Sequence, residues 1–237
     1  TTLLSQVDSS IGGKTGVNNF LGKNMIGTFC QPDAVIVDII FLNSLPKREM
    51  ICGYAEILKH SLISDKKFFV FLKSHFKSIL NLRKEIIKKT ILKSCKIKRT
   101  IVEKDERESN LRKTLNYGHT FAHAFESSLG YTNRLNHGEA VLLGILAASK
   151  FSNKENLLPK DELMLIENNL DELKYNNIKL FFKKKNIKRI LDFMVKDKKN
   201  NSKNINLILL KRIAKPVLNK TYSKIKVKKF LSSLIDK

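Results

Sequence analysis

The stretch HGEAVLLGILAASKF (residues 137–151) indicates the kind of fold that this chain adopts. It predicts a helix, and many of its residues are small, which suits close packing against a neighbouring element. Residues 140–148 are the longest apolar run of the chain. A run of that length is far short of the ~18–20 residues that a membrane-spanning helix needs. The sequence therefore predicts a packed helix and excludes a transmembrane protein.

Working outward from this stretch, helical periodicity dominates the chain. Apolar residues at spacings of three and four predict helices over residues 47–63, 68–82, 85–103, 119–129, 157–182 and 187–196, and a last helix over 227–235. Residues 204–210 and the stretch around Val217 predict a short hairpin, and residues 34–38 predict a short buried strand. Residues 9–27, rich in glycine and asparagine, predict a loop. The fold class is therefore mainly α, preceded by a small β-containing segment.

The composition is that of a globular protein with an uneven positive charge. Of the 237 residues, 42% are hydrophobic and 28% charged, and the formal net charge is +23. From Lys174 onward there are 20 basic and 3 acidic residues. Such a surplus attracts phosphate backbones in a salt-dependent way, which raises the alternative of a nucleic-acid-binding module. Because the tail has few interleaved aromatics and no known binding motif, we expect a solvated surface and no specific nucleic-acid partner.

The cysteines and the first residues bear on compartment and completeness. Cys30, Cys52 and Cys95 are widely spaced and form no CxxC motif, which excludes a disulfide framework and a cysteine zinc site. We expect reduced thiols and a cytoplasmic protein. The chain opens on Thr1, and TTLLSQVDSS lacks the features of a signal peptide. We therefore expect a chain that begins partway through a longer protein.

The glycines divide the chain, since all ten lie between Gly12 and Gly144. Glycine permits tight turns and close approach to ligands, so we expect the chemistry within the first 145 residues. Lys14 and Lys23 each follow a glycine, and lysine on such a turn suits a phosphate or a carboxylate. Each lysine alone is equally typical of a solvated surface. The spacing matches neither a Walker loop nor the G-x-G-x-x-G fingerprint.

Three of the five histidines form the best candidate metal site. His119 and His123 are four residues apart and share a helix face, and His137 opens the next helix. Imidazole suits zinc, although histidines at a surface or core edge show the same spacing. Glu56 lies in an apolar stretch where a carboxylate is costly to bury unless paired or metal-bound; the alternative is a solvent-facing acid in a surface ion pair with Lys59. His60 points to a different helix face, and we interpret it as structural.

Eight strings, in order along the chain, resemble the 3-dehydroquinate synthase family. They are VDSSIGGKTGVN, GKNMIG, LPKRE, GYAEILKH, CKIKRTIVEKDERE, LRKTLNYGHTFAHAFE, HGEAV and DKKN. The resemblance covers nearly the whole chain. It implies that residues 1–45 are the end of an NAD-binding α/β domain whose preceding part is missing, and that residues 46–237 form the α-helical metal- and substrate-binding domain of the dehydroquinate-synthase-like fold.

The resemblance also implies a reaction. Enzymes of this family convert 3-deoxy-D-arabino-heptulosonate 7-phosphate to 3-dehydroquinate and phosphate in the shikimate pathway. The steps are transient oxidation by NAD+, elimination of phosphate, re-reduction, ring opening and aldol closure, with Zn2+ or Co2+ as the metal. The implied partner is a small-molecule sugar-acid phosphate, with no membrane, in a homodimer of the full-length protein. We expect the 237 residues by themselves to be inactive, because most of the NAD site is absent.

Site residues carried over from the family motifs fall into four groups. The implied metal ligands are Glu56, His119 and His137, and the implied catalytic residues are Lys14, Lys59, Glu108 and His123. The implied substrate-binding residues are Asp8, Lys14, Asn24, Lys59, Lys98, Arg112, Asn116, His123, and Lys198 or its neighbour Lys199. The implied NAD-binding residues are Thr1, Thr2, Asp8, Lys14, Lys23, Phe41 and Ser44.

Two departures and one close alternative accompany the resemblance. Ala122 replaces a glycine at a place where helices approach closely, and Ala214 stands where a late glycine is usual. The alternative is a related sugar-phosphate cyclase that makes a cyclitol. Retention of Lys14, Asn24 and Arg112, with LPKRE and DKK, favours dehydroquinate as the product.

Overall fold

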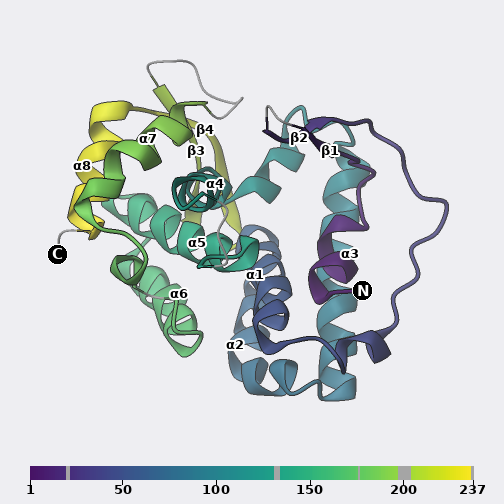
Figure 1. The fold of residues 1–237 in the computed structure, drawn as a ribbon. Helices are drawn as coiled ribbons and strands as arrows, with labels where there is room; N and C mark the ends of the chain where they lie inside the picture. The colour runs from purple at the N-terminus through teal and green to yellow at the C-terminus, as the bar shows by residue number, and fades with distance from the viewer. Residues whose placement is uncertain (20–21, 131–133, 176, 197–203, 236–237) are drawn as a thin grey trace.

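The structure is a computed structural model that describes residues 1–19, 22–130, 134–175, 177–196 and 204–235. Over these residues the fold is mainly helical, as predicted (Figure 1). Its α-helices are α1 (Lys47–Ser64), α2 (Lys66–Leu80), α3 (Lys84–Lys104), α4 (His119–Ser128), α5 (His137–Lys154), α6 (Lys160–Glu172), α7 (Ile187–Lys196) and α8 (Lys224–Ile235). Its strands are β1 (Val17–Asn19), β2 (Gly22–Ile26), β3 (Asn204–Arg212) and β4 (Lys215–Ser223).

Helix α5 is the centre of the core. Helices α1, α4 and α6 and strand β3 all pack against it, with α1 to α3 on one side of the molecule and α6 to α8 on the other (Figure 1). A Cβ atom added to Gly144 would lie 2.3 Å from the carbonyl oxygen of Gly118 and 3.0 Å from the Cβ of Ala122. Helices α4 and α5 therefore meet almost backbone to backbone, which confirms the close approach expected at Ala122.

The predicted hairpin near the C-terminus is confirmed as the antiparallel pair β3–β4. Along β3, Ile205, Leu207 and Leu209 alternate toward the core and are fully or almost fully buried. The turn contains Ala214 with a φ of 67°, a left-handed conformation that glycine adopts more easily. The amide of Ala214 donates a hydrogen bond to the carbonyl oxygen of Leu62 on α1 (2.8 Å), which ties the hairpin to the helical core.

The predicted strand over residues 34–38 is wrong. This segment is extended but pairs with no strand that the structure describes, and Ile36 is 93% exposed. A strand needs hydrogen-bonding neighbours, and the apolar pattern alone cannot supply them. The loop expected over residues 9–27 is partly wrong, because β1 and β2 pair within it as a short antiparallel hairpin.

Other helices begin or end within a few residues of the prediction, with one exception. The helix expected over residues 157–182 is only α6, which follows Pro159 and ends at Glu172. Two residues later, Lys174 has a φ of 65°, a left-handed conformation that interrupts the helix. In the described residues of the remaining span, 173–175 and 177–182, the structure has one short 3-10 helix, Ile178–Leu180.

Among the described residues, none of the helices combines the length and the apolar character needed to cross a lipid bilayer.

Candidate metal centre and its surroundings

Three helices bring the proposed metal ligands together. Glu56 lies in the middle of α1, His119 is the first residue of α4, and His137 is the first residue of α5. One nitrogen from each ring and one carboxylate oxygen all lie within 4.8 Å of one another. Gly118, with a φ of 79°, turns the chain into α4, and Asn136 caps α5 by accepting a hydrogen bond from Glu139 N (2.9 Å). Both imidazoles are therefore held at well-defined helix starts.

Glu56 is the centre of this cluster. Its Oε1 atom lies 3.4 Å from Nε2 of His119 and 3.5 Å from Nε2 of His137. The Glu56 side chain is fully buried, and neither of its oxygens accepts a hydrogen bond from any residue that the structure describes. A buried carboxylate without hydrogen bonds is costly unless a cation compensates it. Lys59 forms an ion pair with the other oxygen, so the side shared by the two imidazoles is the one that fits a divalent ion.

The cluster shifts the pKa values of its members in opposite directions. Burial raises the pKa of Glu56, but the ammonium group of Lys59 and the imidazole of His119 outweigh burial and hold it well below its usual range. Burial, together with Lys59, lowers the pKa of His119. Burial also lowers the pKa of His137, but the carboxylates of Glu126 and Glu56 outweigh it and raise this pKa to about 9.

Each histidine has a contact for its second ring nitrogen. Nδ1 of His119 donates to the backbone carbonyl oxygen of Tyr117 (3.3 Å). Nδ1 of His137 lies 3.7 Å from Oε2 of Glu126. Glu126 was not predicted from the sequence. Its spacing of seven residues from His119 places it on the same face of α4, but it does not indicate the contact with His137 on α5.

A second group of polar side chains adjoins Glu56. Asp8 pairs with the ammonium group of Lys98 (2.7 Å), and its Oδ1 atom lies 3.6 Å from Nε2 of His60. Burial raises the pKa of Asp8, but Lys59, His60 and Lys98 together hold it below its usual range. Asp8, Glu56 and His60 also lie close enough to share an ion, yet each carboxylate already has an ammonium partner. The pair of imidazoles at His119 and His137 makes the first group the better cation site.

The remaining family-implied polar residues form a cluster at the glycine turn. Glu108 forms an ion pair with Lys14 and accepts a hydrogen bond from the amide of Asn116. Arg112 is buried and donates to the carbonyl oxygen of Gly12 (2.6 Å). In this structure Arg112 thus holds the turn after residue 11 against the 3-10 helix Leu111–Asn116.

Comparison with known proteins shows the family of this chain. Residues 53–200 match the family described as 3-dehydroquinate synthase C-terminal, and residues 1–52 match that described as 3-dehydroquinate synthase N-terminal. The chain belongs to the 3-dehydroquinate synthase family. It is 55% identical over 238 residues to 3-dehydroquinate synthase of Pelagibacter ubique (strain HTCC1062), covering 100% of this chain and 65% of the relative. It is 46% identical over 218 residues to 3-dehydroquinate synthase of Buchnera aphidicola subsp. Cinara cedri (strain Cc), covering 91% of this chain and 58% of the relative. The chain thus spans 58–65% of the length of these two curated relatives.

Solved structures share the fold. ValA, a 2-epi-5-epi-valiolone synthase from Streptomyces hygroscopicus subsp. jinggangensis 5008 with NAD+ and Zn2+ bound, superposes with a TM-score of 0.84 and 25% identity over 99% of this chain and 64% of its own. A 2-deoxy-scyllo-inosose synthase complexed with carbaglucose-6-phosphate, NAD+ and Co2+ superposes with a TM-score of 0.78 and 23% identity, over 98% of this chain and 65% of its own. The fold is therefore that of the sugar-phosphate cyclases.

The structure does not bring every family-implied residue to the cluster of Glu56, His119 and His137. His123 does lie beside the cluster: it is exposed, with its ring centroid 5.4 Å from that of His119 and 6.3 Å from that of His137. Thr1, Phe41 and Ser44 lie exposed on the N-terminal segment (residues 1–45), and Thr2 is half-buried there. Side chains outside the described part of the structure are those of Lys23 and Asn24, which lie on β2, and those of Lys198 and Lys199.

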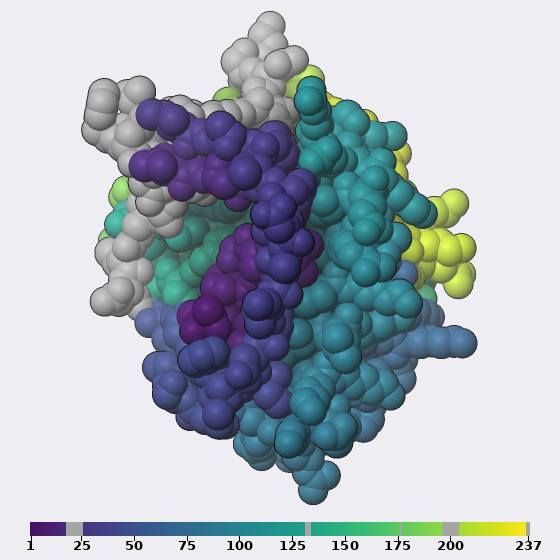
Figure 2. Space-filling view, turned by 90° about the vertical axis from the view of Figure 1, so that its right-hand side faces the viewer, coloured from purple at the N-terminus to yellow at the C-terminus, as the bar shows by residue number. Residues whose placement is uncertain are grey.

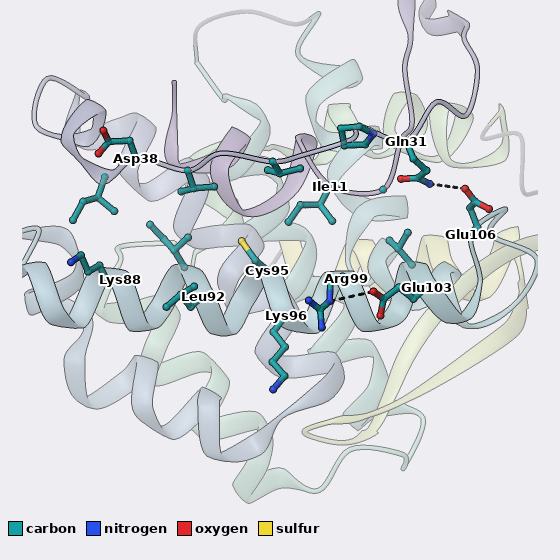
Figure 3. Close-up of a pocket in the computed structure, with 17 residues that line it drawn as sticks. Ile11, Gln31, Asp38, Lys88, Leu92, Cys95, Lys96, Arg99, Glu103 and Glu106 are labelled. Atoms are coloured by element: carbon teal, nitrogen blue, oxygen red, sulfur yellow. Dashed lines mark hydrogen bonds and ion pairs between the residues drawn. The ribbon is translucent and has the colours of Figure 1, made fainter.

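A large cavity lies away from this cluster, between the N-terminal segment and α3. The segment forms a strip over one face of the molecule (Figure 2), and the cavity under it has a volume of about 1170 Å³. Leu92 and Cys95 line it from α3 and Ile11 from the opposite wall, and a hydrogen bond from Gln31 to Glu106 (2.8 Å) closes one end (Figure 3). None of the family-implied metal ligands lines this cavity, and its walls are largely apolar.

Proposed function

We propose that the protein containing this chain is a 3-dehydroquinate synthase. It converts 3-deoxy-D-arabino-heptulosonate 7-phosphate to 3-dehydroquinate and phosphate, with NAD+ and either Zn2+ or Co2+ as cofactors. The observation that carries the proposal is the convergence of Glu56, His119 and His137 from three helices in a chain of this family. Identities of 43–55% to curated 3-dehydroquinate synthases over most of the chain also support it.

The chain's own residues have distinct tasks in this proposal. A divalent ion bound by Glu56, His119 and His137 supplies a Lewis acid that favours loss of a proton from the hydroxyl to be oxidised. Lys59 stays next to Glu56 and keeps that carboxylate ionised, which the ligand role requires. His123, exposed beside the ligand pair, is placed to exchange a proton with the substrate or to contact its phosphate.

Cationic and amide groups would bind the anionic ends of the substrate. Lys14 and Asn116 both contact Glu108, so a substrate carboxylate or phosphate that displaces Glu108 would find two preformed donors. Glu108 released in this way is available as an acid or base. Lys98 forms an ion pair with Asp8, which lies close to Glu56, and it provides another positive charge there. These groups orient the substrate and stabilise charge that develops as its phosphate leaves.

Residues 1–45 belong, in this proposal, to the NAD-binding domain, and residues 46–237 to the metal- and substrate-binding domain. The matches to the N-terminal family over residues 1–52 and to the C-terminal family over residues 53–200 support two domains in this order, although they divide the chain seven residues later. Thr1, Thr2, Lys23, Phe41 and Ser44 would contact the dinucleotide, together with Asp8 and Lys14.

The assembly and compartment follow from the same proposal. The substrate is a small-molecule sugar-acid phosphate, and the full-length enzyme forms a homodimer in the cytoplasm. The three cysteines are free thiols, which suits a reducing compartment. A related cyclase that forms a cyclitol is the second candidate, because the superposed structures include synthases of a valiolone and an inosose.

The test uses the gene product that contains this chain, purified with and without His119→Ala. We expect wild-type protein to retain about one zinc or cobalt ion per chain after dialysis, and to release phosphate from 3-deoxy-D-arabino-heptulosonate 7-phosphate when NAD+ is present. We expect His119→Ala to lose both properties. His75→Asn, on α2 and stacked on Phe71 with ring centroids 4.3 Å apart, is the matched control and keeps both.

Two results would contradict the proposal. One is metal retention by His119→Ala equal to that of the wild type. The other is phosphate release from a heptose or hexose phosphate without a carboxylate, with none from the acid substrate, which would favour the cyclitol-forming alternative.

A further inference from the structure

Glu126 occupies a position that its own helix disfavours. It lies in the last turn of α4, which ends at Ser128, and its side chain is only 11% exposed. Carboxylates are unfavourable near a helix C-terminus because the helix dipole is negative there, and burial adds a desolvation cost. A compensating interaction must therefore hold the charge of Glu126 in place.

One compensating group is the imidazole of His137. Its Nδ1 atom lies 3.7 Å from Oε2 of Glu126, while its Nε2 atom lies 3.5 Å from Oε1 of Glu56. The two ring nitrogens thus face two different carboxylates. We propose that Glu126 is a positioning residue of the metal site, which holds the proton on Nδ1 of His137 and leaves Nε2 as the electron-pair donor toward the ion.

The other imidazole of the site is positioned differently. Nδ1 of His119 donates to the backbone carbonyl oxygen of Tyr117, a contact that no side-chain substitution removes directly. The His137 ring is the more exposed of the two, and its Nδ1 atom faces a side chain, Glu126, where that of His119 faces the backbone. A side-chain carboxylate behind a metal-ligating histidine fixes the ring orientation and strengthens the ligand. Of the two imidazoles, His137 is therefore the one whose ligand quality depends on a replaceable side chain.

The inference rests on the metal site of the proposed function, and metal affinity tests it without reference to activity. We would measure Zn2+ affinity by competition with a chromophoric chelator for wild type, Glu126→Gln and Glu126→Ala in the protein that contains this chain. Visible absorption of the Co2+-loaded proteins reports the ligand geometry. We expect Glu126→Ala to weaken Zn2+ binding by about 10–100-fold and to alter the Co2+ bands. Glu126→Gln keeps an oxygen that can accept a hydrogen bond from Nδ1, so we expect its Zn2+ affinity to fall between those of wild type and Glu126→Ala.

The matched control is Glu167→Gln, which removes a carboxylate of the same size from α6, where Glu167 pairs with Lys150 (3.1 Å). We expect it to bind Zn2+ as the wild type does. Wild-type affinity and unchanged Co2+ bands in both Glu126 variants would overturn this inference and leave the proposed function standing. Equal losses in Glu126→Gln and Glu167→Gln would also overturn it, because net charge would then explain the effect. A wild-type protein that holds no metal would overturn the proposed function, and the inference with it.

Discussion

Replacing Gly138 by alanine is expected to force helices α5 and α1 apart. A Cβ atom at this position would lie 2.2 Å from the Cα and 2.7 Å from the carbonyl oxygen of Cys52, whereas ordinary contacts are 3.4–4 Å. Both obstacles are backbone atoms, so no side-chain rotation relieves them, and the helices must separate by about 1 Å. Overpacking of a core costs 1–3 kcal/mol, and we expect a loss of about 3 kcal/mol in the free energy of unfolding.

The same displacement acts on the metal site. Gly138 is next to His137, and Cys52 lies four residues before Glu56 on α1, so the separation moves His137 away from Glu56. We expect Gly138→Ala to weaken Zn2+ binding as well as stability, measured by urea unfolding and chelator competition.

Gly130→Ala is the control that separates the effect of backbone strain from the effect of steric crowding. It meets no atom within 4 Å but has a φ of 71°, so we expect a loss of about 1–2 kcal/mol and unchanged Zn2+ affinity. The reasoning is refuted if Gly138→Ala proves as stable as Gly130→Ala, or if it binds Zn2+ like the wild type.

Two further changes test the core. Burial raises the pKa of Glu139, but hydrogen bonds from Arg48 and Tyr175 outweigh burial and hold this pKa below 4.5. The ionised carboxylate therefore stabilises the fold at neutral pH, and this stabilisation is lost as the pH falls through the lowered pKa. We expect Glu139→Gln to cost about 2 kcal/mol at neutral pH and the gap to wild type to shrink in acid, followed by urea unfolding across the pH range; a gap that does not depend on pH would contradict this. Phe125 is fully buried, and its ring centroid lies 4.9 Å from that of Phe182. We expect Phe125→Ala to lower the free energy of unfolding by about 4 kcal/mol in the same assay. A loss under about 1 kcal/mol would contradict this and show that neighbouring side chains fill the cavity.

Local sequence patterns were sufficient for most of the helices and for the C-terminal hairpin. Helical periodicity and alternation reside in a few consecutive residues, so α7, predicted over 187–196, and the β3–β4 hairpin needed no knowledge of their neighbours. The family and the candidate metal ligands could also be predicted from the sequence, because the order and spacing of motifs along the chain can be read without a structure. Ala214 shows the same: the departure from glycine was visible in the sequence, and its left-handed φ gives the physical reason for the usual residue.

Tertiary structure decided everything that depends on a partner distant in the chain. The segment over residues 34–38 has the apolar pattern of a strand, but sheet formation requires neighbouring strands, and the described residues provide none beside it. Likewise, neither His60 facing Asp8 nor Glu126 facing His137 follows from spacing, since each pair joins residues from different elements. The choice between a solvated Glu56 and a buried one was also open, because burial depends on how α1, α4 and α5 pack, and only their close contacts place that carboxylate between two imidazoles.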